Sequence, residues 1–435
     1  MKKKVWIAIS LFIAICLAAG LWIWIVKFEQ EKPTIKISPD QSYLGQKLDL
    51  QISDEKSGVA EVRVEALQKG NTVILWQEKI PKGTNKLEKT ISLRPLPAGL
   101  KDGETELKVF ARDHSWNWGN PVTVTKKFVV DTHPPQINVL GGIHYINQGG
   151  TGCITYQTSE ETPISGVQVG EKLFPGYLRE KNHYLVFFTL GYEQVKELAI
   201  YAVAEDQAGN KGKVSLRLIP KAKKFKADKI QLTESFLKSI VPYFTERNPN
   251  LRGSLIDIFL AINRQQREAD HQEIRKICQE TSSQPLWSGA FLRLPNSKPM
   301  ALFAEQRSYW YNGQEVDQQV HLGIDLASLA QSPIPAANNG RVVFAGPLGI
   351  YGNTVIIDHG CGLFSMYAHL SSIKTEIKKE VQKGDLIGHT GSTGLAGGDH
   401  LHFSMLIHGV FVNPIEWWDD HWIRDNVEKK MELIR

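Results

Sequence analysis

The residues best suited to chemistry lie in the last third of the chain, where eight of the thirteen histidines follow residue 320. His321 and Asp325 are four residues apart. His400 and His402 lie on either side of Leu401, directly before the alternating apolar run at 403–407. Because alternate side chains of a strand share a face, we expect His400 and His402 to point to the same side. Two imidazoles and a carboxylate make a ligand set that suits zinc. Three protein ligands leave a fourth tetrahedral position for water, which is typical of catalytic zinc sites.

These residues belong to three motifs that occur in a fixed order. H-x-x-x-D spans 321–325, Y-A-H-L spans 367–370 and H-L-H-F spans 400–403. Glycine-rich segments accompany them at 340–343, 352–360, 383–388 and 391–394, followed by Asn413-Pro414. Together they make residues 294–418 resemble the lysostaphin-type (LytM-like) peptidoglycan zinc endopeptidases. The resemblance implies an antiparallel β-sheet domain of the duplicated hybrid motif type.

The resemblance also implies a role for each matching residue. The ligands of one zinc ion would be His321, Asp325 and His402. The catalytic pair beside the metal would be His369 and His400, one accepting a proton from water while the other steadies the oxyanion. The sequence leaves open which histidine takes which part.

Three further residues are candidates for the substrate groove: Arg307, Asn353 and Tyr367. The family's Phe-Gly-x-Arg segment reads Phe303-Ala-Glu-Gln-Arg307 here, so the turn before Arg307 departs from the family pattern.

The N-terminal segment predicts where such an enzyme works. Residues 5–26 carry no charge, and as a helix they would be roughly 33 Å long, enough for the hydrocarbon core of a bilayer. Three lysines precede the segment, and the positive-inside rule then places the N-terminus in the cytoplasm. We therefore expect a single-pass anchor in the bacterial inner membrane, with a C-terminal ectodomain in the periplasm or cell-wall space. A cleaved signal peptide is the alternative, and the length of the apolar run disfavours it.

A repeated set of landmarks organises the middle of the chain. An A-x-D segment followed by Gly-Asn occurs at 111–120 and again at 204–210, each time between alternating segments. Alternation bounded by turn residues predicts strand–turn–strand units. About 100 residues per unit fits a β-sandwich, and the unit ends resemble bacterial immunoglobulin-like modules. Such modules act as spacers or as binding surfaces, so envelope proteins are candidate partners.

The segment 221–284 has a different character. Four lysines between 221 and 226 predict a basic, solvated linker, and apolar residues at helical spacing then predict an α-helical hairpin. We expect this hairpin to pack on a neighbouring domain and to carry no chemistry of its own.

The sequence therefore predicts a mainly β, multidomain protein. Its expected parts are a cytoplasmic tail and transmembrane anchor (1–30), two immunoglobulin-like β-sandwiches (31–132 and 133–220), a basic linker and helical hairpin (221–284) and the zinc peptidase domain (285–435). The net charge of +5 includes three N-terminal lysines and does not predict nucleic-acid binding.

The function predicted from these features is a membrane-anchored zinc metalloendopeptidase that hydrolyses the peptide cross-links of peptidoglycan. Two alternatives stay open. One is a non-catalytic envelope scaffold that activates a separate cell-wall hydrolase. The other is an endopeptidase that acts on a protein or a secreted peptide.

Overall fold

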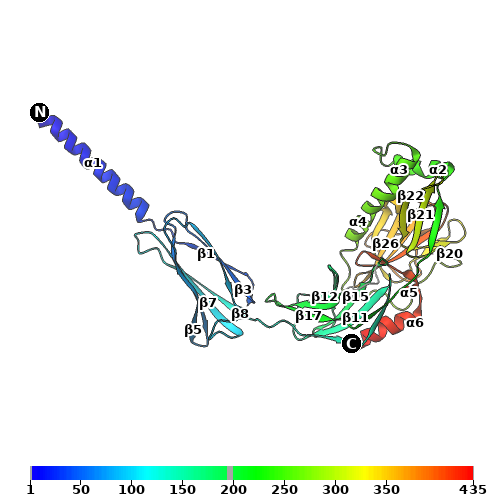
Figure 1. Cartoon of the computed structure of the whole chain (residues 1–435), viewed down its shortest axis with the longest axis horizontal. Helices are drawn as coiled ribbons and strands as arrows, with labels where there is room; N and C mark the ends of the chain where they lie inside the picture. The colour runs from blue at the N-terminus through cyan, green and yellow to red at the C-terminus, as the bar shows by residue number, and fades with distance from the viewer. Residues whose placement is uncertain (1, 194–198, 435) are drawn as a thin grey trace. The chain divides into compact units, whose positions relative to one another are not determined.

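The computed structural model describes residues 2–193 and 199–434, excluding the side chains at positions 2–5, 8 and 26. The chain divides into two compact units (Figure 1). Unit 1 comprises Met1–Pro135 and Glu205–Gly212, and unit 2 comprises Gln136–Ala204 and Lys213–Arg435. The domain boundaries predicted from the sequence stay predictions.

Unit 1 begins with helix α1 (Lys2–Lys27). Within the described part of the chain, no helix combines the length and the hydropathy needed to cross a membrane. The predicted anchor at 5–26 begins and ends on side chains outside the described set, and it is not confirmed.

An antiparallel sheet and a mostly antiparallel sheet follow α1 and enclose one core. The first has the order β1-β3-β6, and the second has the order β2-β8-β7-β4-β5, in which β2 pairs with β8 in parallel. Alternate residues such as Leu48, Ile52, Val62 and Val109 are buried between the sheets. The strands are β1 (Thr34–Ser38), β2 (Tyr43–Leu44), β3 (Lys47–Ser53), β4 (Val59–Gln68), β5 (Asn71–Lys79), β6 (Lys86–Ser92), β7 (Gly103–Asp113) and β8 (Val122–Val130). This is a β-sandwich, and its immunoglobulin-like character stays a prediction.

The repeated turn has a simple physical cause. After β7, Asn120 donates through Nδ2 to Asp113 Oδ2 at 2.9 Å, and in the second copy Asn210 makes the same 2.9 Å bond to Asp206. Each aspartate therefore ties a strand end to the asparagine that closes the turn, which explains why the A-x-D and Gly-Asn segments recur together.

Unit 2 starts with a second set of strands. They form sheets with the orders β14-β15-β11-β9 and β13-β12-β16-β17, plus a parallel pair, β10-β18. The strands are β9 (Ile137–Leu140), β10 (His144–Asn147), β11 (Thr151–Thr158), β12 (Ile164–Val169), β13 (Lys172–Pro175), β14 (Tyr177–Leu178), β15 (His183–Thr189), β16 (Ile200–Glu205), β17 (Lys211–Ser215) and β18 (Leu218–Lys221).

The helical hairpin is present as predicted from the apolar spacing. It contains α2 (Glu234–Thr245), α3 (Leu255–Ala261), a π-helical turn, η1 (Ile262–Gln266), and α4 (Arg267–Ile277). Thr233 caps α2, and a capping box between Ser254 and Asp257 starts α3. The segment before the hairpin is only partly the linker that its lysines predict, because β19 (Ala227–Gln231) pairs in parallel with β21.

The C-terminal part is built on an eight-stranded sheet with the order β20-β23-β31-β27-β26-β25-β29, to which β32 adds beside β31. Its strands are β20 (Lys298–Ala301), β23 (Ile324–Ala327), β25 (Gly340–Pro347), β26 (Asn353–Gly360), β27 (Leu363–Leu370), β29 (Glu380–Val381), β31 (Leu401–Ile407) and β32 (Val410–Val412). Their pairings are antiparallel, as the resemblance implies.

Two small sheets complete this part. One has the order β19-β21-β22, with β21 (Glu305–Tyr311) and β22 (Gln314–His321), and the other has the order β24-β30-β28, with β24 (Pro333–Pro335), β28 (Ser372–Ile373) and β30 (Leu386–His389). The 3₁₀ turn η2 (Gly349–Tyr351) precedes β26. The chain ends in short helical pieces, α5 (Pro414–Trp418), α6 (Asp420–Ile423), η3 (Arg424–Glu428), α7 (Lys429–Met431) and η4 (Glu432–Ile434).

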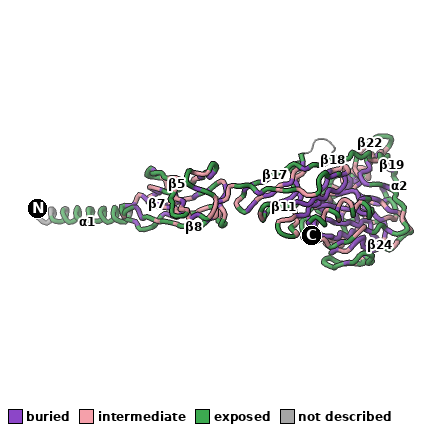
Figure 2. The backbone as a smooth tube through the Cα atoms, turned by 90° about the horizontal axis from the view of Figure 1, so that it is seen from below, coloured by how far each residue is buried: buried purple, intermediate pink, exposed green. Residues whose placement is uncertain are grey.

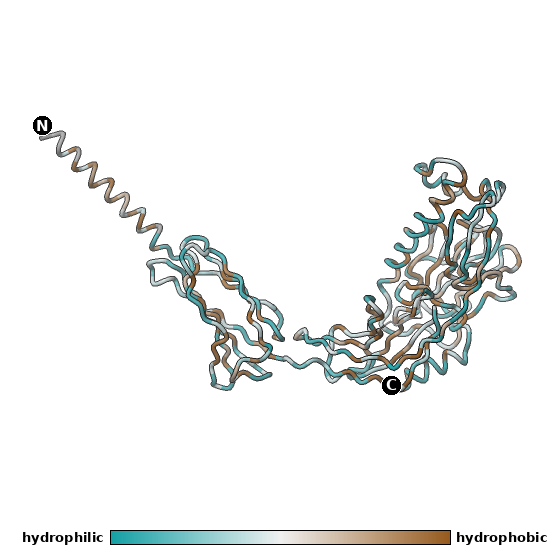
Figure 3. The backbone as a smooth tube through the Cα atoms, in the orientation of Figure 1, coloured by the Kyte–Doolittle hydropathy of each residue, from teal (hydrophilic) through white to brown (hydrophobic). Residues whose placement is uncertain are grey.

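One hydrophobic core runs through unit 2, from the second set of strands through the helices into the C-terminal sheet (Figure 2). Trp417 on α5 is fully buried and packs edge-on against Phe187 of β15, with ring centroids 5.8 Å apart. Figure 3 colours the backbone by hydropathy and shows hydrophobic stretches along the strands and hydrophilic turns between them. The elements that hold the candidate site therefore rest on a shared core.

Candidate metal centre

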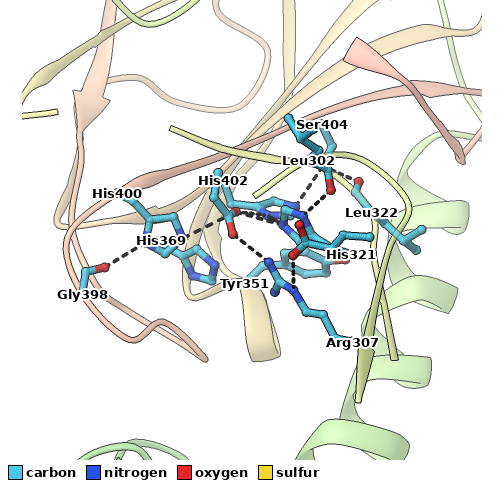
Figure 4. A network of polar contacts seen from close by, with 12 residues as sticks. Leu302, Arg307, His321, Leu322, Tyr351, His369, Gly398, His400, His402 and Ser404 are labelled. Atoms are coloured by element: carbon cyan, nitrogen blue, oxygen red, sulfur yellow. Dashed lines mark hydrogen bonds and ion pairs between the residues drawn. The ribbon is translucent and has the colours of Figure 1, made fainter. Parts of the chain in front are cut away.

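Three potential metal ligands meet where three strands lie close together. His321 ends β22, and Asp325 on β23 pairs directly with His402 on β31. His321 Nε2 and His402 Nδ1 each lie 2.9 Å from Asp325 Oδ1 and 3.0 Å from each other (Figure 4). A tetrahedral zinc site with bonds of 2.0–2.1 Å would place its ligand atoms about 3.3 Å apart. The donor set and its spacing therefore fit zinc.

Contacts behind the two imidazoles orient them toward the centre. His321 Nδ1 lies 3.0 Å from the Leu302 carbonyl oxygen, and His402 Nε2 lies 3.0 Å from Ser404 Oγ, which itself donates to the Leu322 carbonyl. Both arrangements place the N–H on the outward nitrogen and leave the inward nitrogen as an electron-pair donor, as a metal ligand requires. Ser404 therefore supports the orientation of the His402 ring.

Glycine is required between the first two ligands. A Cβ on Gly323 would lie 2.5 Å from His402 Nε2 and 2.6 Å from Ser404 Oγ, inside the contact distance of either atom. The glycine of the H-L-G-I-D segment therefore makes room for the His402 ring.

His369 and His400 stand beside these three residues. Their ring centroids are 4.9 Å apart, and the His369 ring is 5.8 Å from that of His402. His369 Nδ1 contacts the Thr393 carbonyl oxygen at 2.8 Å, and His400 Nδ1 contacts the Gly398 carbonyl oxygen at 2.8 Å. Each ring therefore leaves Nε2 available, and His400 Nε2 lies 3.6 Å from Asp325 Oδ1. His369 has φ +65°, a left-handed conformation that side chains other than glycine adopt rarely.

Burial and charge set the protonation of the site. Burial lowers the pKa of His402 to about 4 and holds the pKa of His369 well below its ordinary value. Burial would raise the pKa of Asp325, but the surrounding histidines outweigh it and hold that pKa well below the ordinary range. Burial also opposes the charged form of His400, yet its contact with Asp325 raises its pKa overall. At neutral pH, His369 and His402 are thus neutral and Asp325 is ionised.

The predicted groove residues have different positions. Arg307 on β21 lies beside the cluster, with Nη2 3.2 Å from Asp325 Oδ2 and Nε 3.3 Å from Glu305 Oε1. Tyr367 does not line the cavity that opens onto the three potential ligands and is described below. It is 1% exposed, packs on Phe403, and its hydroxyl accepts a hydrogen bond from the Ala337 N–H. Asn353 does not line it either, because its side chain donates to the Leu370 carbonyl. The structure thus brings Arg307 to the site and buries Tyr367 in the core. Asn353 contacts Leu370 and Thr393 next to His369, and its role in a groove stays a prediction.

A cavity of about 490 Å³ opens onto this cluster. Its walls include His321, Asp325, His369, His400 and His402. The helical hairpin packs on its neighbour as expected and also contributes Phe236, Phe259 and Arg267 to the same cavity; that it carries no chemistry of its own stays a prediction.

Sequence reasoning did not identify Tyr351 as part of the site. Its ring centroid lies 5.5 Å from that of His402 (Figure 4). Its hydroxyl is 3.0 Å from Nε2 of His271 on α4. Tyr351 lies on the 3₁₀ turn η2, between the glycine-rich segments, and no spacing rule links it to the histidine motifs. Its role is visible only because the turn folds back against β31.

Comparison with known proteins places this region in a peptidase family. The model of peptidase family M23 matches residues 319–414, which contain all five residues of the cluster. The DD-carboxypeptidase/endopeptidase Mpg of Neisseria meningitidis serogroup B (strain MC58) is 41% identical over 97 residues, 22% of this chain and 22% of Mpg. The chain therefore spans about a fifth of the length of that relative.

Two further relatives are named NlpD. The lipoprotein NlpD of Yersinia enterocolitica is 40% identical over 94 residues, which cover 21% of this chain and 96% of the relative. The murein hydrolase activator NlpD of Salmonella typhimurium is 40% identical over 96 residues, 22% of this chain and 25% of the relative. The solved catalytic domain of the peptidase lysostaphin from Staphylococcus simulans aligns at 25% identity over 30% of this chain and 98% of that domain, with a TM-score of 0.26. Through its C-terminal domain, the chain belongs to peptidase family M23.

Proposed function

We propose that the chain is a zinc-dependent endopeptidase that hydrolyses peptide cross-links of peptidoglycan. One observation carries the proposal: His321, Asp325 and His402 converge as metal ligands, while two more imidazoles, His369 and His400, face the same cavity without being needed as ligands. A site built only to bind a metal for stability has no need of that second pair.

The proposed chemistry assigns work to this chain's own residues. A zinc ion bound by the three ligands would lower the pKa of a water molecule and polarise the scissile carbonyl. His369 and His400, each with Nδ1 directed to a backbone carbonyl, offer Nε2 to accept the proton of the attacking water or to steady the oxyanion. Arg307 pairs with Asp325 through Oδ2, the oxygen that does not face the two histidine ligands, and so holds this carboxylate in place.

The direct test uses the purified chain with isolated sacculi and with defined cross-linked muropeptides. We expect release of uncross-linked peptides, loss of that release when a chelator is added, and recovery when zinc is restored. His421→Ala is the matched control, because that side chain is 73% exposed and belongs to no part of the site. Sacculi left uncleaved by a zinc-loaded chain would contradict the proposal, and cleavage of a protein substrate instead would support a different peptidase.

A second candidate function is that of a scaffold that activates a separate cell-wall hydrolase. It is favoured by the similarity to the Salmonella protein that is named an activator. Complementation of a deletion separates the two functions. A His402→Ala chain should fail to complement if the chain is an enzyme and should complement fully if it is a scaffold.

The place of action is a separate proposal that depends on sequence alone. We infer an inner-membrane protein with its C-terminal part in the periplasm or cell-wall space, because lysines at 2–4 precede the uncharged run at 5–26. The sandwich modules would then act as spacers or as surfaces for envelope proteins. Fractionation of cells producing the full chain tests this proposal, and recovery in the cytosolic fraction would overturn it.

A further inference from the structure

A second cavity, of about 710 Å³, lies next to the one at the metal centre. Arg267, Arg307, Leu322, Ala227 and Asp228 line both cavities, so the two spaces share a wall. Arg267 starts α4 and lies outside the region matched by the M23 family model. Its position is therefore a feature of the hairpin in this chain.

Arg267 is held close to the metal centre by a chain of contacts. One helical turn further along α4, His271 Nε2 lies 3.0 Å from the hydroxyl of Tyr351, and the Tyr351 ring lies 5.5 Å from that of His402. Asp270 anchors the same helix by accepting the backbone N–H of Ile350 at 2.7 Å. Helix α4 is thus docked against the turn that supports the cluster.

The π-helical turn fixes the direction of the Arg267 side chain. The Arg267 N–H bonds to the carbonyl of Ile262, five residues back, and the Asn263 carbonyl instead receives Arg267 Nε at 3.0 Å. Arg267 Nη2 also donates to Asn263 Oδ1 at 2.5 Å, and Asn263 Nδ2 donates to Asp317 at 2.8 Å. Two of the five guanidinium N–H groups are therefore used, on neutral oxygens, and π turns of this kind are frequent at functional sites.

Charge pairing distinguishes Arg267 from Arg264 and Arg307, the other two arginines that line these cavities. Arg307 pairs with Asp325 and Glu305, Arg264 pairs with Asp317, and Lys229 lies 3.4 Å above the Trp310 ring. Among the residues that the structure describes, no carboxylate lies within ion-pair distance of Arg267. Among the described residues no hydrogen bond occupies its remaining donors, and arginine suits a carboxylate because its planar fork can make two parallel bonds.

We propose that Arg267 binds a free carboxylate of the peptide substrate while the scissile bond lies at the metal centre. This inference rests on the proposed function, because it names the substrate class as a peptide with an unamidated carboxylate. Arg267 is a specificity residue in this role and takes no part in the reaction at the carbonyl.

The test uses a series of synthetic peptidoglycan stem peptides in which each free carboxylate is replaced, one at a time, by a carboxamide. Binding to the full chain is measured by calorimetry in the presence of a chelator, so that no turnover occurs, and KM and kcat are then measured with zinc. For the wild-type chain, one replacement should weaken binding roughly 10- to 100-fold, the loss of a charge-assisted pair. The Arg267→Gln chain should bind the parent peptide more weakly by a similar factor. It should bind the peptide that carries the affinity-lowering carboxamide as tightly as the wild-type chain does.

Arg267→Lys and Lys276→Gln complete the design. The lysine variant keeps the charge without the fork and should lie between wild type and Arg267→Gln. Lys276 lies on the same helix and pairs with Glu273, and neither residue lines a cavity, so its loss should change no binding constant. If Arg267→Gln fails to fold, the peptide series measured on the wild-type chain and on Arg267→Lys still tests whether Arg267 binds a substrate carboxylate.

Two outcomes would overturn the inference: no amide replacement weakens wild-type binding, or Arg267→Gln weakens binding of every peptide equally. Failure of the proposed function gives a different result. In that case the peptides bind in an Arg267-dependent way, and the zinc-loaded chain hydrolyses none of them.

Discussion

Two clusters of potential metal ligands in this chain differ in one instructive respect. Glu29, Asp54 and Asp113 in unit 1 and His321, Asp325 and His402 in unit 2 both bring three ligand atoms within 4.8 Å of one another. In unit 1 the oxygens are already used: Asp54 Oδ1 accepts the N–H groups of residues 56, 57 and 58. In unit 2 the inward atoms contact one another and His400 Nε2, and the cluster faces a cavity. Proximity alone therefore does not define a metal centre, because the lone pairs must also be free.

Loss of one ligand in unit 2 should have the largest effect. His402→Ala leaves two ligands, and we expect hydrolysis of cross-linked muropeptides to fall by 10³-fold or more, to the background, since positioning of the metal is lost. Asp54→Asn, in the other cluster, should leave the rate unchanged. Rates and zinc content measured on both variants test the comparison, and a zinc-free, active His402→Ala chain would break it.

The two imidazoles that are not ligands should show a smaller loss. His369→Ala and His400→Ala should each retain zinc and lose roughly 10²- to 10⁴-fold in kcat, the range for proton transfer by a positioned side chain. Zinc content measured with single-turnover rates checks this expectation. A variant that loses zinc as completely as His402→Ala would mean that its imidazole is a ligand.

Zinc itself should stabilise one cluster and not the other. With free zinc at 100 times its dissociation constant, the free energy of unfolding rises by about 2.7 kcal/mol for a site that exists only in the folded state. We expect this rise in thermal unfolding of the wild-type chain and of Asp54→Asn, and none for His321→Ala. A zinc response lost in Asp54→Asn would show that the carboxylate cluster binds the ion.

The smallest predicted effect concerns a buried carboxyl away from both clusters. Burial raises the pKa of Glu416 from 4.5 to about 6. Between these values the folded state keeps a proton that the unfolded state releases, so stability falls as the pH rises. The loss is ~2 kcal/mol and is complete above about pH 6. Glu416→Gln should remove this pH-dependent loss. The difference in unfolding free energy between the wild-type chain and Glu416→Gln should therefore change with pH. Parallel curves from pH 4.5 to 7 would contradict this assignment.

The residues of the cluster were predicted from motifs that resemble those of a known family, and the spacing of His400 and His402 agreed with strand geometry. His400 and His402 point to the same side. The H-x-x-x-D motif contains Gly323, where the His402 ring comes too close to leave room for a side chain. The A-x-D and Gly-Asn landmarks were equally informative, since each pair is joined by one side-chain hydrogen bond.

Residues placed by long-range packing could not be predicted in this way. All eight residues of β27 are buried, so alternation gives no indication that Tyr367 faces the core. The lysines before residue 227 suggested a linker, yet the next strand pairs with β21, about 80 residues further on. Phe236, Phe259 and Arg267 reach the cavity only because the hairpin docks beside η2, and no local pattern encodes that contact.

The joint between α5 and the second set of strands limits how this protein can be divided. Glu416 accepts hydrogen bonds from Asn147 and from the Thr151 N–H, and Trp417 donates to Thr151 Oγ1. A fragment beginning at the family-matched region would leave an indole surface bare and a carboxylate without its donors. Preparations of the hydrolytic half should therefore start upstream of residue 136, or solubility will be lost before catalysis can be assayed.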